Sequence, residues 1–329
     1  MLSIANIDPR LVGAVIFVFG LMIGSFLNVV IYRLPAEESI VWPGSHCPKC
    51  NRSLHAWENI PVLSWLFLRG RCHTCRSPIS WRYPAIELLT GGLYWAVFAA
   101  FGFTAQTAFL LVFVSLLVAI FWIDFDTQYI FDQTTFPGVA LGLLYSYFIT
   151  HQFWQALAAA LYAVAAVSLV YGLSWLILRE EGIGGGDLTL VAMIGAWLGL
   201  KGMILALMLG VLFGALMGMV MVFVGYVRDR FWPPVALAFG STLVFFTATE
   251  ALYRFALPMT PRWEMHAAFG TFAALVGASL GYFYTRSTRD RDTEKPRIPF
   301  GPALVLGGMV SLFWGDALFT WYMTQMGPI

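Results

Sequence analysis

Uncharged apolar runs of about twenty residues or longer recur along most of this 329-residue chain. A hydrocarbon core about 30 Å thick is crossed by a helix of roughly 20 consecutive apolar residues. Such runs cover residues 11–32, 88–123, 133–178, 202–227, 231–249 and 298–315. Only 11% of the residues are charged, which is too few to cover the surface of a soluble protein of this length. The sequence therefore predicts an integral membrane protein in contact with lipid, and no nucleic-acid partner is expected.

Two of these runs are long enough to form two helices each. Turn-forming residues break one run near residues 102–107 and the other near residues 151–155. Two shorter stretches, 188–200 and 265–285, add further helices. The fold class is therefore predicted to be all-α and polytopic, with about ten transmembrane helices.

The distribution of polar residues predicts how the chain is divided. We expect a first transmembrane helix at 1–32, a cytoplasmic zinc-binding loop domain at 33–83, a transmembrane core at 84–226, additional helices and a polar loop at 227–295, and a C-terminal transmembrane helix at 296–329. If the first helix runs from outside to inside, fifteen of the nineteen Lys and Arg residues lie on the inner side. Positive charge is retained in the cytoplasm, so this orientation is favoured and the expected location is a bacterial inner membrane.

All four cysteines lie in the 33–83 loop as two Cys-x-x-Cys pairs, Cys47 with Cys50 and Cys72 with Cys75. Two such pairs can place four thiolates around a tetrahedral cation, as structural zinc requires. Two disulfides are the main alternative, but the cytoplasm is reducing. A thioredoxin-type redox motif fits less well, because no βαβ pattern surrounds the pairs. Zinc would also explain how so short a loop folds.

Two aspartates, Asp124 and Asp187, are expected at the same face of the membrane. Asp124 follows an apolar run that descends toward the cytoplasm, and Asp187 opens a helix that climbs from the same interface. Two carboxylates a few ångströms apart share a proton and titrate as a coupled pair. The ionised member can draw a proton from water while the protonated one polarises a scissile carbonyl. We therefore predict a proteolytic pair on the cytoplasmic side.

A glycine-rich segment, GIGGGD, leads into Asp187. Gly184 and Gly186 would let a substrate backbone approach closely and would permit unusual dihedral angles before the helix. Taken alone, Asp187 is equally consistent with a helix N-cap. Asp124 alone is equally consistent with an interfacial charge that has no role. Asp132 is assigned only a supporting role.

These segments resemble the type IV prepilin peptidases, the bifunctional leader peptidase and N-methyltransferase enzymes of bacterial inner membranes. The resemblance covers about residues 10–226 and 296–315 and rests on GSFLNVVIYRLP, the whole cysteine loop, IDFDTQYIFD, GIGGGDLTLVAMIGAWLG and IPFGPALVLGG. The fourth of these segments contains the Gly-x-Gly-Asp pattern of intramembrane aspartyl proteases.

The resemblance implies a substrate class and a second activity. The substrates would be prepilins or pseudopilins, cut after a glycine at the end of a short basic leader, with Asp124 and Asp187 as the catalytic pair. The enzyme would then methylate the new N-terminus with S-adenosylmethionine. Because no Rossmann-type glycine fingerprint is present, a methyl-donor site is expected near the zinc loop and Glu87. Glu87 is equally consistent with a first-turn carboxylate of a helix. The basic leader is expected to meet Glu37, Glu38, Glu58 or the aspartates.

The chain also departs from the family pattern. Phe131 stands where a proline is usual, and Thr189 stands where a lysine is usual, which puts a substrate contact at that position in doubt. Residues 227–295 replace what is usually a short connection.

Two other functions are consistent with the residues alone. In a cation-coupled transporter, Asp124 and Asp187 would bind the cation and the zinc loop would be regulatory. Transport sites tend to lie near the midplane of the membrane, however, whereas these aspartates are expected at its edge. A non-catalytic assembly factor with a zinc scaffold fits the two carboxylates and the glycine run less well.

Overall fold

A computed structural model describes residues 8–178, 185–229 and 300–325 of the chain. Within these ranges the elements are helices, and the only β pairing consists of two isolated bridges. Six of the helices there are long and apolar enough to cross a membrane. The predicted helical, multi-pass class is therefore confirmed. The chain divides into two compact units, Met1–Ile123 and Asp124–Ile329.

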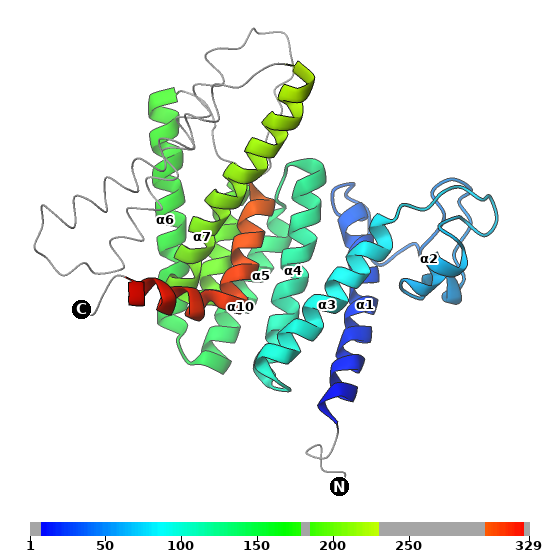
Figure 1. Ribbon diagram of the computed structural model, residues 1–329, viewed down its shortest axis with the longest axis horizontal. Helices are drawn as coiled ribbons and strands as arrows, with labels where there is room; N and C mark the ends of the chain where they lie inside the picture. The colour runs from blue at the N-terminus through cyan, green and yellow to red at the C-terminus, as the bar shows by residue number, and fades with distance from the viewer. Residues whose placement is uncertain (1–7, 179–184, 230–299, 326–329) are drawn as a thin grey trace, which may run out of the picture. The chain divides into compact units, whose positions relative to one another are not determined.

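The first unit consists of two packed helices, the cysteine loop between them and most of a third helix (Figure 1). Its elements are α1 (Pro9–Arg33), η2 (Ala56–Asn59), α2 (Leu63–Phe67), α3 (Arg82–Phe101) and α4 (Ala105–Thr127) as far as Ile123. Proline at the first position of α1 is favourable, since no helical partner for its missing N–H is needed there. Asp8 caps the same helix by accepting a hydrogen bond from the Arg10 N–H at 2.9 Å.

α1 and α3 approach each other closely through small residues. A Cβ atom added at Gly20 would lie 2.8 Å from the Cα of Gly91, and one added at Gly24 would lie 2.7 Å from the Cα of Glu87. Lipid tails are as apolar as helix faces, so the hydrophobic effect does not drive helices together inside a membrane. They associate through such close packing and through interhelical hydrogen bonds. The two ends of the cysteine loop are therefore attached to a pair of closely packed helices.

The second unit contains the remaining helices that the structure describes. Its elements are the end of α4, α5 (Asp132–Tyr145), the π-helical turn η3 (Ser146–Thr150), α6 (Phe153–Leu178), α7 (Gly185–Asp229) and α10 (Gly301–Gln325). α7 is interrupted at Gly199, whose φ of 67° and ψ of −175° are not helical. This break separates the two apolar stretches that the sequence predicts as separate helices.

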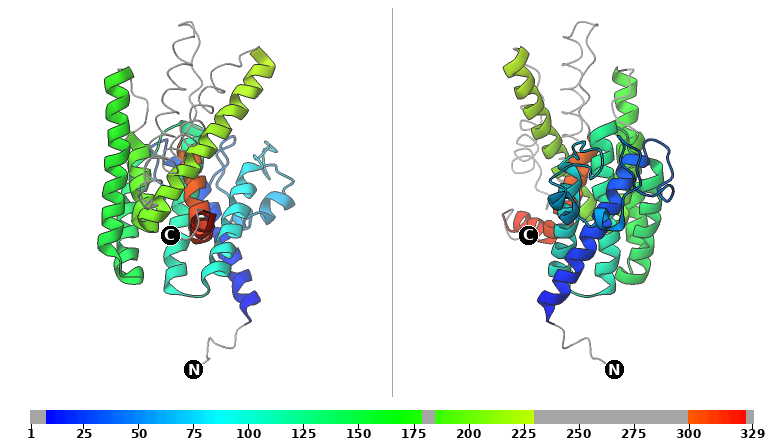
Figure 2. Two further views of the ribbon diagram at one scale, coloured as in Figure 1. Left: turned by 60° about the vertical axis from the view of Figure 1, so that its left-hand side comes forward. Right: turned by 90° about the vertical axis from the view of Figure 1, so that its right-hand side faces the viewer.

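α7 and α10 pack along a line of small residues, which we call the α7–α10 seam (Figure 2). The residues that face one another are Gly202, Ala206 and Gly210 on α7 and Leu304, Gly307 and Ser311 on α10. The Ser311 hydroxyl donates to the carbonyl of Gly202 at 2.8 Å. A Cβ atom at Gly307 would overlap the Ala206 carbonyl. The seam fixes where the first residue of α10 lies in the unit.

The predicted helix breaks are confirmed where they can be compared. α3 ends at Phe101 and α4 begins at Ala105, and α6 begins at Phe153. The predicted helices within 231–249 and 265–285 lie outside the described residues. The total of about ten therefore stays a prediction.

Candidate active site and cysteine cluster

Asp124 lies near the end of α4 and is almost fully buried, with 4% of its surface exposed. Its Oδ2 atom is buried and has no hydrogen-bond partner among the described residues. The same atom lies against Gly301, the first residue of α10, so that a Cβ atom built there would overlap the carboxylate. Burying a carboxylate in this way costs free energy, and buried carboxylates in membrane proteins usually mark a functional site.

Ile130, in the connection between α4 and α5, links this carboxylate to the start of α7. A Cβ atom at Gly186 would lie 2.6 Å from Ile130 Cβ, and one at Gly301 would lie 2.9 Å from Ile130 Cδ1. Asp187 follows Gly186 directly, in the first turn of α7. The end of α4 and the starts of α7 and α10 therefore meet around one isoleucine.

Hydrogen bonds hold α5 against the first half of α7. The Thr135 hydroxyl donates to Thr189 Oγ1 at 3.0 Å, and the Thr189 hydroxyl donates to the Gly186 carbonyl at 3.0 Å. Further along, the Trp197 indole donates to the Gly138 carbonyl at 2.8 Å. Thr189, the residue that departs from the family pattern, thus ties the backbone before Asp187 to α5. Threonine at this position has a structural partner within the chain.

The remaining predicted site residues have different surroundings. Asp132 is exposed in the first turn of α5, where a carboxylate interacts favourably with the helix dipole. Gly184 lies outside the described residues. Glu87 is buried in α3 and accepts a hydrogen bond from the Val62 N–H at 2.7 Å. Glu87 therefore connects α3 with the loop.

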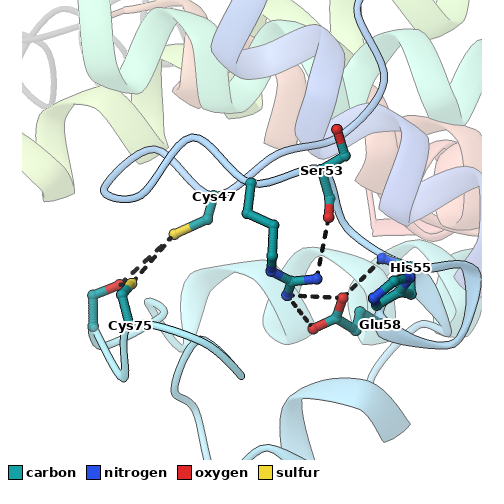
Figure 3. Close-up of polar contacts among 7 residues, drawn as sticks. Cys47, Ser53, His55, Glu58 and Cys75 are labelled. Atoms are coloured by element: carbon teal, nitrogen blue, oxygen red, sulfur yellow. Dashed lines mark hydrogen bonds and ion pairs between the residues drawn. The ribbon is translucent and has the colours of Figure 1, made fainter.

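The four cysteines gather at one point, as their spacing predicts. Their sulfur atoms all lie within 4.8 Å of one another, and none of the four is in a disulfide. Figure 3 shows Cys47 and Cys75 pointing toward each other, with Sγ atoms 3.8 Å apart. Four thiols arranged in this way form a donor set for a single metal ion.

The two Cys-x-x-Cys turns have the same local structure. The N–H of Cys47 donates to Arg52 and that of Cys72 to Ser77, each at 2.9 Å, with one isolated β bridge closing each turn. The residue after the second cysteine of each pair has a left-handed backbone, with φ of 57° at Asn51. In the first turn, this backbone lets the N–H groups of Lys49 and Cys50 donate hydrogen bonds to the Cys47 sulfur. Hydrogen bonds from Cys50 and Lys49 lower the pKa of the Cys47 thiol to about 6, which favours the thiolate that binds metals.

Glu58 forms an ion pair with Arg52 in the cysteine loop (Figure 3). Arg52 donates to both carboxylate oxygens at 2.7 and 3.0 Å, and the His55 N–H donates to Oε2 at 2.8 Å. Only 1% of the Glu58 side chain is exposed. Its contacts support a role inside the loop, and the expectation that Glu58 meets the basic leader stays a prediction. The sequence did not identify Arg52 as its partner.

Substituting Glu58 by Gln is expected to loosen the loop by about 1–3 kcal/mol, because the guanidinium of Arg52 loses its charged partner. The Arg52 hydrogen bonds hold the pKa of Glu58 below its ordinary value, so this stabilisation is present at neutral pH and is lost as the pH falls through that lowered pKa. The measurement is the rate at which a thiol reagent labels the two buried cysteines, Cys47 and Cys72, in the presence of a chelator. The exposed Glu37, changed to Gln, is the control. Equal labelling rates in both variants would contradict this role.

Comparison with known proteins identifies the family. Models of the bacterial peptidase A24 N-terminal domain and of the type IV leader peptidase family match residues 18–101 and 111–219. Two relatives named prepilin leader peptidase/N-methyltransferase match nearly end to end. The one from Myxococcus xanthus (strain DK1622) is 35% identical, over 92% of this chain and 90% of its own length. The one from Aeromonas hydrophila is 33% identical, over 99% and 98%. No solved structure matches the chain.

The first model covers the cysteine loop, and the second covers the segments around Asp124 and Gly186. The chain therefore belongs to the prepilin leader peptidase/N-methyltransferase family.

Proposed function

We propose that this chain is a membrane aspartyl endopeptidase that removes the leader of prepilins or pseudopilins after a glycine, at the cytoplasmic face, and then N-methylates the new terminus. The observation that carries the proposal is the enclosure of Asp124 where the starts of α7 and α10 meet. The names of the relatives support the substrate class and the second activity. They do not favour the transporter alternative.

In the proposed mechanism Asp124 and Asp187 share one proton. The ionised carboxylate takes a proton from the attacking water, while the protonated carboxyl group donates a hydrogen bond to the scissile carbonyl. Burial favours a shared proton, because two charges in a poorly solvated place cannot both be retained. Because Gly186 and Gly301 have no side chains, Ile130 and the Asp124 carboxylate lie directly against the starts of α7 and α10.

The cysteine cluster is proposed to hold structural zinc. A tetrahedral zinc ion with bonds of about 2.3 Å separates its sulfurs by about 3.8 Å. The Cys47–Cys75 separation of 3.8 Å fits this geometry. All four positions would be filled by protein, so the metal would fold the loop and would not take part in cleavage.

Purified protein is expected to contain about one zinc ion per chain, and a Cys47→Ser variant is expected to lose it. Elemental analysis of both proteins is the measurement. His73→Ala is the control, because the His73 ring packs edge-on against Trp57 with centroids 5.7 Å apart. Well under one zinc ion in the unmodified protein, together with four reactive thiols, would refute the assignment.

Methyl transfer requires S-adenosylmethionine, which would supply an electrophilic methyl group. The buried Glu87 carboxylate accepts a hydrogen bond from the Val62 N–H, and its place in the expected donor site stays a prediction. The role that its contacts support is structural, since it ties the cysteine loop to α3.

The proposal is tested by co-expression with a prepilin in a host that lacks its own leader peptidase. The expected product is a pilin shortened by its leader and heavier at its new N-terminus by one methyl group, measured by intact mass. A shortened but unmethylated product would limit the function to cleavage. An unprocessed prepilin in the presence of well-folded enzyme would refute the proposal.

A further inference from the structure

The helix α2 in the cysteine loop is apolar on the side that faces away from the loop. Leu63, Leu66 and Phe67 lie on one helical face and are exposed, with Phe67 78% exposed. Trp65 points the other way, donating its indole N–H to the Ile79 carbonyl at 3.1 Å and packing against Gly70. The loop therefore uses one side of α2 for its own core and leaves the other side exposed among the described residues of the first unit.

The height of α2 relative to the membrane follows from its anchor on α3. Val62, directly before α2, donates its N–H to Glu87, which lies five residues into α3. At 1.5 Å per residue, Glu87 is about 7.5 Å below the first residue of a helix that is itself a candidate span. The loop therefore folds back beside the helix ends, as Figure 1 shows for α2, and does not extend away from them. α2 therefore lies beside the first turns of a candidate membrane-spanning helix, close to the boundary between the hydrocarbon core and the headgroups.

Val62 is held in this position at a conformational cost. Its φ of 62° is unusual for a β-branched residue, and such backbone strain persists only where the surrounding structure fixes it. Glu87 supplies one of the fixing contacts, since its carboxylate accepts the Val62 N–H. The hydrogen bond between Val62 and Glu87 thus fixes the position of α2 beside α3.

The turn that follows α1 carries a second set of exposed apolar side chains, Val41 and Trp42. The buried Arg33, in the last turn of α1, donates to the carbonyls of Ser39 at 2.9 Å and Gly44 at 3.4 Å. Between them, Val41 is 83% exposed and Trp42 is 77% exposed. Tryptophan is enriched where a membrane meets water, because its ring is apolar and its N–H is polar.

We infer that Val41, Trp42, Leu63, Leu66 and Phe67 form an interfacial patch that inserts among the lipid headgroups of the chain's own membrane. The charge of the loop matches such a surface. Residues 33–83 contain seven Lys or Arg residues and three Glu residues, a surplus of four positive charges. Anionic headgroups attract such a segment, and apolar side chains at the interface add binding energy. This inference is independent of the proposed peptidase activity.

The experiment places an environment-sensitive fluorescent amino acid at position 67 of the full chain in proteoliposomes. Lys49, an exposed polar residue of the first Cys-x-x-Cys turn, is labelled in the same way as the water-facing reference. Lipids spin-labelled near the carbonyl are expected to quench position 67 about threefold or more above position 49, because interfacial apolar faces are buried only ~5–10 Å deep. Lipids labelled at the chain end are expected to quench position 67 less. Replacing neutral by anionic lipid is expected to increase the quenching at position 67.

Two results would overturn the inference. One is quenching at position 67 that does not exceed quenching at position 49. The other is a blue-shifted, shielded probe at position 67 that no spin-labelled lipid quenches in either lipid mixture. That result would show that a protein segment covers the patch.

Discussion

Replacing Asp124 by Asn is expected to lower the rate of leader cleavage by ~10³-fold or more, because a positioned acid or base contributes about that factor. Asparagine keeps the size of the side chain but can neither share a proton nor accept one from water. Asp187→Asn is expected to have the same effect. The double variant is expected to lose little more than either single one, since residues that act as a unit have non-additive effects.

The measurement is the fraction of prepilin processed on co-expression, followed by initial rates with purified enzyme. Asp126→Asn is the matched control, because Asp126 lies on the same helix, two residues from Asp124, and is exposed. Zinc content reports on folding of the loop independently of cleavage. If both Asp124→Asn and Asp187→Asn process the leader normally, the catalytic assignment is wrong.

The second large effect is expected at Gly301. A Cβ atom there would overlap Asp124 Oδ2, so Gly301→Ala forces the carboxylate or the start of α10 to move. A displacement of about 1 Å can cost ~10²-fold in rate when reacting groups must be aligned. Cleavage is therefore expected to fall by ~10²-fold while every carboxylate is retained.

Gly172→Ala is the control for this substitution. Gly172 lies within α6 and a Cβ atom there would have no neighbour within 4 Å, so alanine is expected to be neutral or slightly stabilising. Detergent-solubilised proteins would be compared in cleavage rate and in thermal stability. Undiminished cleavage by Gly301→Ala would show that Asp124 is not constrained by α10 as described.

The sequence predicts the local features of this chain well. Apolar length and turn residues predict where α3 ends and α6 begins, and the spacing of Cys47, Cys50, Cys72 and Cys75 predicts one cluster. Both kinds of feature depend on residues that are close in sequence or on a single repeated motif. The pairing of Asp124 with Asp187 follows only from topology and stays a prediction.

Contacts between distant helices could not be predicted in the same way. α4 and α10 are apolar all around, so their sequences do not indicate which face meets a neighbour. Nothing local to Ile130 or Gly301 indicates that they lie beside Asp124. The segment IPFGPALVLGG does draw attention to the start of α10, although only by resemblance. The ion pair of Glu58 with Arg52 was likewise not predicted, because several basic residues of the loop could have been its partner.

The α7–α10 seam has a consequence for how the carboxylate site can move. Gly202, Ala206 and Gly210 recur every four positions on α7, and Gly307 and Ser311 lie four positions apart on α10, so a slide of α10 along α7 by less than four residues, about 6 Å, would bring larger side chains into these close contacts. A slide of four residues would bring Val305 to the place of Gly301, where its side chain would overlap the Asp124 carboxylate. Both small and large slides of α10 are thus disfavoured by shape. Any opening for substrate must come from tilting or separating whole helices, which leaves the register intact.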